Sequence, residues 1–234
     1  MKVTLLAYTP EPEKVVAAAA RCCYSNDDPD RLLDNITTEK AQNFLKMLGD
    51  LGHASPLEHV SFTFSISGVS RSFLAQITRH RHTAFSVRSQ RYCDMSNAGV
   101  VMPASINEPD TVGTFAESIA HAQNAYKLLI DSGVKKEDAR FVLPEGTKTS
   151  MVVTMSAREL LAACSLRCCN RAQLEIRTCF TEMARLVKEV APVMFANIGP
   201  SCQQHGFCPE GNKCCGKAPT MDMLIKTYKE AAQV

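Results

Sequence analysis

The sequence contains no apolar run long enough to span a bilayer, and it has almost no excess of charge. It holds 26 lysines and arginines against 24 aspartates and glutamates, which gives a formal net charge of only +2. A membrane helix needs about 20 consecutive apolar residues, and a general polyanion binder needs a wide basic surface. The opening residues have no small-residue cleavage site before Pro10, which predicts a first strand rather than a signal peptide. We therefore expect a cytoplasmic protein without membrane or nucleic-acid partners.

Internal repeats, low-complexity tracts and flexible linkers are also missing. A chain of 234 residues that is 45% hydrophobic and 21% charged suits one large domain with a substantial core. We predict a main domain over residues 1–200, and then a cysteine-rich tail over residues 201–234 that ends in a helix from about Met221 to Ala232.

Hydrophobic periodicity predicts a mixed α/β domain with much helix. Residues 60–67 alternate strictly between apolar and polar side chains, which is typical of a half-buried strand. Residues 70–81 have helical spacing and lead into a basic stretch that is expected to be a loop. The segment Ser156-Ala157-Arg158-Glu159 matches a capping box and predicts the start of a helix. The other expectations are strands over 1–8 and 148–154, a turn over 25–30, and helices over 11–23, 38–48, 111–132, 136–142 and 171–189.

Carboxylates are absent from residues 70–92, which contain five arginines. The run from Arg79 to Tyr92 holds four of them, with two histidines, two serines, a glutamine and a tyrosine. Cations without internal counter-charges repel one another unless water or an external anion screens them, and arginine pairs bidentately with phosphate. A solvated basic loop is the alternative, but the interleaved recognition residues favour a nucleotide or cofactor phosphate site.

The eleven cysteines do not predict a disulfide framework, because their number is odd and no secretion signal is present. Most lie in predicted helices, where a small buried thiol is the usual explanation. The tail is different, because its cysteines and histidine could hold a tetrahedral zinc ion, form one reversible disulfide or remain reduced. These tail residues are Cys202, His205, Cys208, Cys214 and Cys215.

Two further groups have a reactive interpretation beside a structural one. His53, Glu58 and His59 could be metal ligands, but such residues beside a Ser-Pro turn are common without metal. Cys93 could be a covalent nucleophile, but no active-site sequence of that kind surrounds it, which favours a structural thiol. We predict no metal site in the chain.

Four ordered motifs resemble those of the flavin-dependent thymidylate synthases. The first is Arg79-His80-Arg81, then seven residues, then Ser89-Gln90-Arg91-Tyr92. The resemblance covers roughly residues 1–195. The other three motifs are His53-x-Ser55-x-x-Glu58-His59, Ala139-Arg140-Phe141-Val142-Leu143-Pro144, and Ser156-Ala157-Arg158 … Leu166-Arg167 … Ala172-Gln173-x-Glu175-Ile176-Arg177.

The resemblance implies a fold and a reaction. The fold is α+β, a single domain with a central, mostly antiparallel sheet and flanking long helices. The activity is that of a FAD-dependent methyltransferase in dTMP biosynthesis, which converts dUMP to dTMP with methylenetetrahydrofolate as carbon donor and NADPH as reductant. The assembly is a homotetramer with its sites at subunit interfaces.

The resemblance also implies roles for individual residues. Arg167 is the expected catalytic residue, because a guanidinium on the uracil imide stabilises its enolate-like form without an enzyme nucleophile. Arg79 and Arg91 are suited to phosphate, and Ser89 to substrate orientation rather than nucleophilic attack. The implied dUMP-binding residues are Gln76, Arg79, Arg88, Ser89, Gln90, Arg91, Arg140 and Arg167. The implied FAD-binding residues are Ser55, Glu58, Arg79, His80, Arg81, Ser156 and Arg158.

The chain departs from the family pattern at three positions. Val87 stands where many members have Glu, so a contact there would be through the backbone. Ser156 stands where many have Asn, which shortens a flavin contact to a hydroxyl. Ala162 aligns with a further flavin-facing Asn, and that role is not carried over to it.

Arg158 and Arg167 are nine residues apart on one expected helix, and they therefore face opposite sides of it at 100° per residue. If both touch one ligand stack, the stack must wrap the helix or involve another subunit.

The alternative function is a nucleic-acid-binding protein that uses the arginine-rich stretch and a zinc-binding cysteine tail, but the sequence lacks a wider basic surface.

Overall fold

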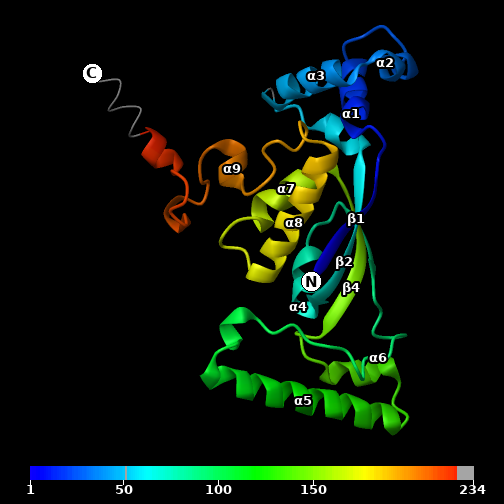
Figure 1. Ribbon diagram of the computed structural model, residues 1–234, viewed down its shortest axis with the longest axis vertical. Coiled ribbons are helices and arrows are strands. Elements are labelled where there is room, and N and C mark those ends of the chain that lie inside the picture. The colour runs from blue at the N-terminus through cyan, green and yellow to red at the C-terminus, as the bar shows by residue number, and fades with distance from the viewer. Residues whose placement is uncertain (51, 226–234) are drawn as a thin grey trace. The chain divides into compact units, whose positions relative to one another are not determined.

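The computed structural model describes residues 1–50 and 52–225, and it contains a four-stranded antiparallel sheet with many helices (Figure 1). The strand order is β1-β2-β4-β3. The backbone divides into two compact units: residues 1–3 with 65–153, and residues 4–64 with 154 onward. The strands are β1 (Lys2–Tyr8), β2 (Ser61–Ser70), β3 (Thr83–Val87) and β4 (Lys148–Ser156).

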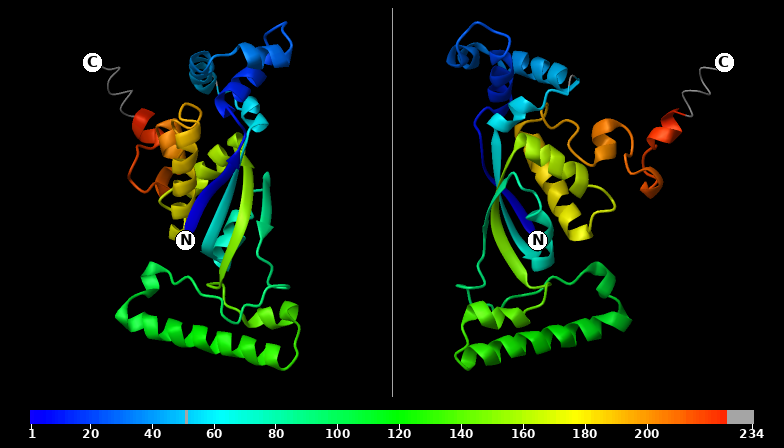
Figure 2. Two further views of the ribbon diagram at one scale, coloured as in Figure 1. Left: turned by 45° about the vertical axis from the view of Figure 1, so that its right-hand side comes forward. Right: turned by 180° about the vertical axis from the view of Figure 1, so that it is seen from behind.

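The larger unit, residues 4–64 and 154 onward, packs helices around aromatic side chains. The Phe62 ring meets the Phe195 ring edge-on at 5.2 Å and stacks on the Tyr8 ring at 6.3 Å. Helices α7 and α8 lie side by side in every view (Figure 2). The unit's elements are α1 (Pro12–Cys22), α2 (Pro29–Asn35), α3 (Thr38–Asp50), the 3-10 turn η1 (Ser55–His59), α7 (Ala157–Arg167), α8 (Leu174–Val190), α9 (Ser201–His205), η4 (Gly211–Lys213) and a helical turn over 221–225.

A buried carboxylate joins distant parts of this unit. Glu13 of α1 is 7% exposed, and its Oε1 accepts the backbone N–H groups of Val193 at 2.7 Å and Met194 at 3.0 Å. Its Oε2 accepts the side-chain amide of Gln42 at 2.9 Å. These hydrogen bonds satisfy a polar side chain that burial alone would penalise, and they fix the turn after α8 against α1.

The smaller unit, residues 1–3 and 65–153, is built around Tyr126. This ring is fully buried with Met95 and Ala139, and its hydroxyl accepts the backbone N–H of Met95 at 3.3 Å. Ser70 begins α4 by accepting the N–H of Phe73 at 2.9 Å, an ordinary N-cap. The unit's elements are α4 (Arg71–Ile77), β3, η2 (Ala104–Ile106), α5 (Pro109–Asp131), α6 (Lys136–Ala139) and η3 (Arg140–Val142).

The structure confirms the α+β class and the strand predicted over residues 60–67, which begins one residue later and continues to Ser70. Two local predictions are wrong. The expected turn over 25–30 contains the start of α2, because Pro29 at the first helical position has its φ already set for a helix. The basic stretch is not all loop, because β3 occupies Thr83–Val87.

Other boundaries differ less. Helix α4 ends at Ile77, four residues before the predicted end, and α8 begins at Leu174 rather than near residue 171. The predicted C-terminal helix is present over 221–225, and the remainder of it lies outside the described residues. The domain boundary at residue 200 stays a prediction. None of the helices within 1–50 and 52–225 is both long and apolar enough to cross a membrane.

Candidate functional site

The arginine segment, residues 79–92, is presented by two regular elements of the smaller unit. It follows α4, where the N–H of His80 still bonds the carbonyl of Ile77 at 3.1 Å. It continues through β3, and then the N–H of Arg88 bonds the carbonyl of Ser150 on β4 at 2.9 Å. The segment is therefore anchored to the sheet rather than freely solvated.

The side chains of the arginine segment fall into an exposed set and a buried set. The four guanidinium-bearing residues are exposed, whereas His80 and Gln90 are each 8% exposed. Ser89 is half-buried, and its hydroxyl accepts the N–H of Arg91 at 3.2 Å. The segment thus combines two buried polar residues with four exposed cations.

Most of these cations lack an internal counter-ion. Among residues 1–50 and 52–225, no carboxylate forms an ion pair with Arg79, Arg81 or Arg88. Arg91 is the exception, because its Nε donates to Oε2 of Glu137 at 2.8 Å. Exposed guanidinium groups without an internal anion fit an external phosphate.

Glu137 of α6 supports two of the predicted dUMP-binding residues. Its carboxylate pairs with Arg91, and its backbone carbonyl accepts Nε of Arg140 at 3.0 Å. Lys136 on the same helix donates to the carbonyl of Tyr92 at 3.1 Å. The short helix therefore fixes the end of the arginine segment and Arg140 together.

Arg71 is a neighbour that sequence reasoning missed. Burial lowers the pKa of the Arg71 guanidinium, Glu145 raises it, and the nearby Arg140 lowers it. Arg71 thus adds a cation beside Arg140. Its only sequence signal was its place among the five arginines of residues 70–92.

In the larger unit, three predicted flavin-binding residues contact one another. The Ser156 hydroxyl donates to Oε2 of Glu58 at 2.8 Å, and Nη1 of Arg158 donates to Oε1 of Glu58 at 3.4 Å. Ser156 also caps α7 by accepting the N–H of Glu159 at 3.2 Å. The predicted start of the helix at Ser156 is confirmed, and the serine that replaces the family's usual Asn both caps the helix and donates to Glu58. Ser55 lies exposed at the start of η1, three residues before Glu58.

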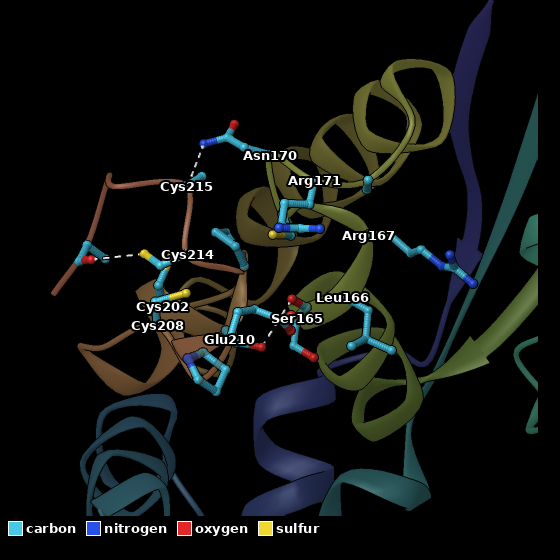
Figure 3. A pocket seen from close by; sticks show the side chains of 16 residues that line it. Ser165, Leu166, Arg167, Asn170, Arg171, Cys202, Cys208, Glu210, Cys214 and Cys215 are labelled. Carbon is cyan, nitrogen blue, oxygen red and sulfur yellow. Dashed lines mark hydrogen bonds between the residues drawn. The ribbon is translucent and has the colours of Figure 1, made fainter. Parts of the chain in front are cut away.

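Arg167 is the last residue of α7, and Arg158 lies on the same helix, as predicted. Arg167 lines a cavity of about 250 Å³ that also includes the turn between α7 and α8 and the cysteine-rich tail. In Figure 3 its side chain extends away from the labelled cysteines, whereas Arg171 lies toward them. Arg171 donates to the carbonyl of Lys213 at 2.7 Å.

The structure thus brings together Glu58, Ser156 and Arg158 in one unit, and Arg91 and Arg140 through Glu137 in the other. Glu137 was not predicted, because an acid 46 residues downstream carries no signal of its pairing with Arg91.

Within the described part of the chain, no group of three or more His, Cys, Asp or Glu side chains is placed to hold a metal ion.

The chain is similar in sequence to known proteins of one family and similar in fold to a solved structure. Residues 4–193 match the family model described as thymidylate synthase complementing protein. A flavin-dependent thymidylate synthase of Geobacter sulfurreducens is 46% identical over 229 residues, which are 97% of this chain and 98% of that protein. One from Clostridium tetani is 43% identical over 241 residues, or 96% of each chain. The solved structure of the UMP/dUMP methylase PolB from Streptomyces cacaoi has a similar fold, with a TM-score of 0.71, 24% identity, and coverage of 83% of this chain and 93% of that chain.

Proposed function

Because this chain belongs to the flavin-dependent thymidylate synthase family, we propose that it is a FAD-dependent methyltransferase that converts dUMP to dTMP. Methylenetetrahydrofolate supplies the carbon and NADPH supplies the reducing equivalents. The observation that carries the proposal is the arginine segment. Its four arginines are exposed, and in the described chain only Arg91 has a carboxylate partner. The sequence around it matches family members over nearly its whole length.

The anionic nucleotide is the ligand that suits this segment. Arg79, Arg88 and Arg91 bind the phosphate, because a dianion compensates their mutual repulsion. Arg140, fixed by Glu137, adds a cation at the end of the segment. The remaining contacts come from Gln76, Ser89 and Gln90, which orient the pyrimidine.

The donor set also fits a flavin dinucleotide. A pyrophosphate needs cations and hydroxyl donors, and Arg79 and Arg81 are exposed cations beside the buried His80. Ser55, Glu58, Ser156 and Arg158 are the other proposed FAD-binding residues, and Ser156 and Arg158 both donate to the Glu58 carboxylate. The flavin, when bound, supplies hydride chemistry.

Arg167 activates the substrate. Its guanidinium donates to the uracil imide, stabilises the negative charge of the enolate-like ring and so makes the ring carbon nucleophilic. No enzyme nucleophile takes part, and Ser89 acts through orientation.

We propose a cytoplasmic homotetramer with its sites at subunit interfaces. Tyr92 and Phe141 are 73% and 83% exposed, and each directly follows a proposed dUMP-binding arginine in the sequence. Large aromatic groups in contact with water favour burial against another surface, which supports a partner subunit at this edge of the site.

The purified protein tests the function directly. We expect a flavin absorbance band near about 450 nm, and dTMP formation that requires dUMP, methylenetetrahydrofolate and NADPH together. Absence of the band, with RNA binding that weakens steeply as salt rises, would instead support the nucleic-acid-binding alternative.

A further inference from the structure

The tail over residues 201–220 is docked on the turn between α7 and α8 by several contacts. Arg171 donates to the carbonyl of Lys213 at 2.7 Å, and the Asn170 side-chain amide reaches the sulfur of Cys215 at 3.6 Å. At the start of the tail, the Ser201 hydroxyl donates to the carbonyl of Ser165 at 3.2 Å. The cysteines of this tail are therefore held in place rather than carried on a loose end.

The backbone of the tail closes into a loop around two of these cysteines. The N–H of Cys208 bonds the carbonyl of Pro219 at 2.7 Å, and Cys208 forms an isolated bridge with Thr220. Cys214 lies between these ends, where its sulfur approaches the carbonyl of Ala218 at 3.4 Å. Cys208 and Cys214 therefore belong to one short closed loop.

The Cys208 and Cys214 side chains line one cavity, together with Cys202 (Figure 3). The N–H of Glu210 lowers the pKa of Cys208, burial and the Cys214 thiol raise it, and the net direction is upward. The Cys214 sulfur accepts the N–H of Gly216 at 3.3 Å.

Exposure also distinguishes the pair. Cys208 is 7% exposed, whereas Cys214 is half-buried, and both line the cavity of about 250 Å³. Because Cys214 is the more exposed of the two, a small reagent reaches it first, and Cys208 is placed to react second. The described residues offer no group of three donors arranged around a metal position, so the geometry favours two-thiol chemistry over coordination.

We propose that Cys208 and Cys214 are a thiol-modification site that low-molecular-weight disulfides convert to an intramolecular disulfide. The Cys214 thiolate attacks a glutathione disulfide, forms a mixed disulfide and releases one glutathione thiolate. The Cys208 sulfur then attacks the Cys214 sulfur and forms the Cys208–Cys214 bond. The second glutathione leaves as the thiol and takes the Cys208 proton. The two cysteines lose two electrons in total, and the glutathione disulfide gains them.

The bond has a structural consequence at the cavity. It closes a covalent ring that includes Lys213, whose carbonyl holds Arg171. Arg171 lies four residues beyond Arg167 and lines the same cavity. Oxidation therefore fixes the wall of the cavity that the tail contributes.

Trypsin provides a direct readout, because it cleaves after Lys213 and so separates the two cysteines. Cys208 falls in the peptide 189–213, and Cys214 falls in the peptide 214–217. The full-length protein is incubated with glutathione disulfide, remaining thiols are blocked with N-ethylmaleimide, and the digest is analysed by mass spectrometry without reduction. We expect the two peptides to be joined, and dithiothreitol to separate them.

Serine variants identify the bonded pair, because each peptide contains a second cysteine. Cys202→Ser and Cys215→Ser should keep the linkage, whereas Cys208→Ser and Cys214→Ser should abolish it. No linkage in the wild-type protein, or linkage that survives Cys208→Ser, would overturn the proposal. So would one equivalent of zinc released from the reduced wild-type protein by a mercurial reagent. The assay contains no dUMP, so its result is independent of dTMP synthesis.

Discussion

At the scale of single residues, Arg91 is held from one side by Glu137 and presents its remaining donors to a ligand. The contact uses Nε at 2.8 Å, and in an arginine the two terminal nitrogens can then meet a phosphate. An ionised hydrogen bond contributes about 1.5–3 kcal/mol. We therefore expect Arg91→Ala to raise KM for dUMP by roughly 10- to 100-fold while flavin content stays unchanged.

Steady-state kinetics and flavin absorbance on the same preparation measure both quantities. Arg185→Ala is the matched control, because Arg185 is an exposed arginine of α8 paired with Glu182 and Glu189. Equal losses of dUMP affinity and flavin would contradict a phosphate role for Arg91.

Arg167 is expected to act on the reaction rather than on flavin binding. If its guanidinium stabilises charge on the pyrimidine, Arg167→Ala should lower kcat by roughly 100-fold or more and leave the flavin bound. The measurement is dTMP formation under saturating substrates together with the absorbance spectrum. Arg171→Ala removes a neighbouring guanidinium of the same cavity and should retain turnover. Normal turnover by Arg167→Ala would show that another group activates the substrate.

Cys179 is expected to make the free energy of unfolding fall as the pH rises in the alkaline range. Burial raises the pKa of this thiol from its usual 9.0 to about 12. Between these values the unfolded chain loses a proton that the folded chain keeps, so the free energy of unfolding falls as pH rises, by about 1.4 kcal/mol per pH unit. The contribution of Cys179 to the free energy of unfolding is thus complete below pH 9.0. It is lost as the pH rises toward the pKa of about 12 that the thiol has in the folded protein.

Urea unfolding at several pH values above 9.0 measures this slope. In Cys179→Ala the slope should be shallower by about one proton, or about 1.4 kcal/mol per pH unit. Cys22→Ala, which removes an exposed thiol, should keep the wild-type slope. Identical slopes in all three proteins would show that Cys179 does not cause the pH dependence.

The residue types of the site could be predicted from the sequence, but the distant residues that contact them could not. Four arginines without an acid in residues 79–92 indicate an anion site by charge alone. Glu137 and Arg71 escape such reasoning because their roles depend on which distant side chains the fold brings near them. Long-range pairing is set by packing, and a local pattern of residues contains no record of it.

At the scale of elements, the start of α7 combines a helix cap with a proposed cofactor contact. Ser156 accepts the N–H of Glu159 and donates to Glu58. Ser156→Ala loses the cap and should lower the free energy of unfolding by about 1 kcal/mol. Ser156→Asn, which keeps a good capping residue, should remain within about 0.5 kcal/mol of the wild type. Denaturant unfolding of the three proteins measures the difference, and equal losses in both variants would contradict the capping role.

Elements with strong local signals were predictable, and β3 and α2 show where those signals fail. The alternation of residues 60–67 identified β2 because one face of that strand is fully buried. In β3, Thr83, Phe85 and Val87 are only half-buried, so the apolar face is weak and the flanking cations dominate the pattern. In α2, a run of turn-forming residues precedes Pro29, which in this position starts a helix.

At the scale of the whole molecule, the family relationship and the exposed aromatic groups together predict self-association. Phe141 is 83% exposed and adjoins the half-buried Arg140, so water covers a large apolar surface beside a proposed binding residue. A partner subunit that covers this ring would gain about 25 cal/mol for each Å² of apolar surface buried. We expect the wild-type protein to have the mass of a homotetramer in light scattering coupled to size-exclusion chromatography.

Phe141→Ser should shift this mass toward smaller species and lower dTMP formation together, because a site shared between subunits is incomplete in the dissociated protein. Tyr24→Ser is the matched control, since Tyr24 is 74% exposed and its ring stacks on His53, which is not among the proposed binding residues. Flavin content measured on each separated species shows whether the cofactor needs the assembled form. A wild-type monomer with full activity would refute interface sites, and dissociation without loss of activity would place each complete site within one chain.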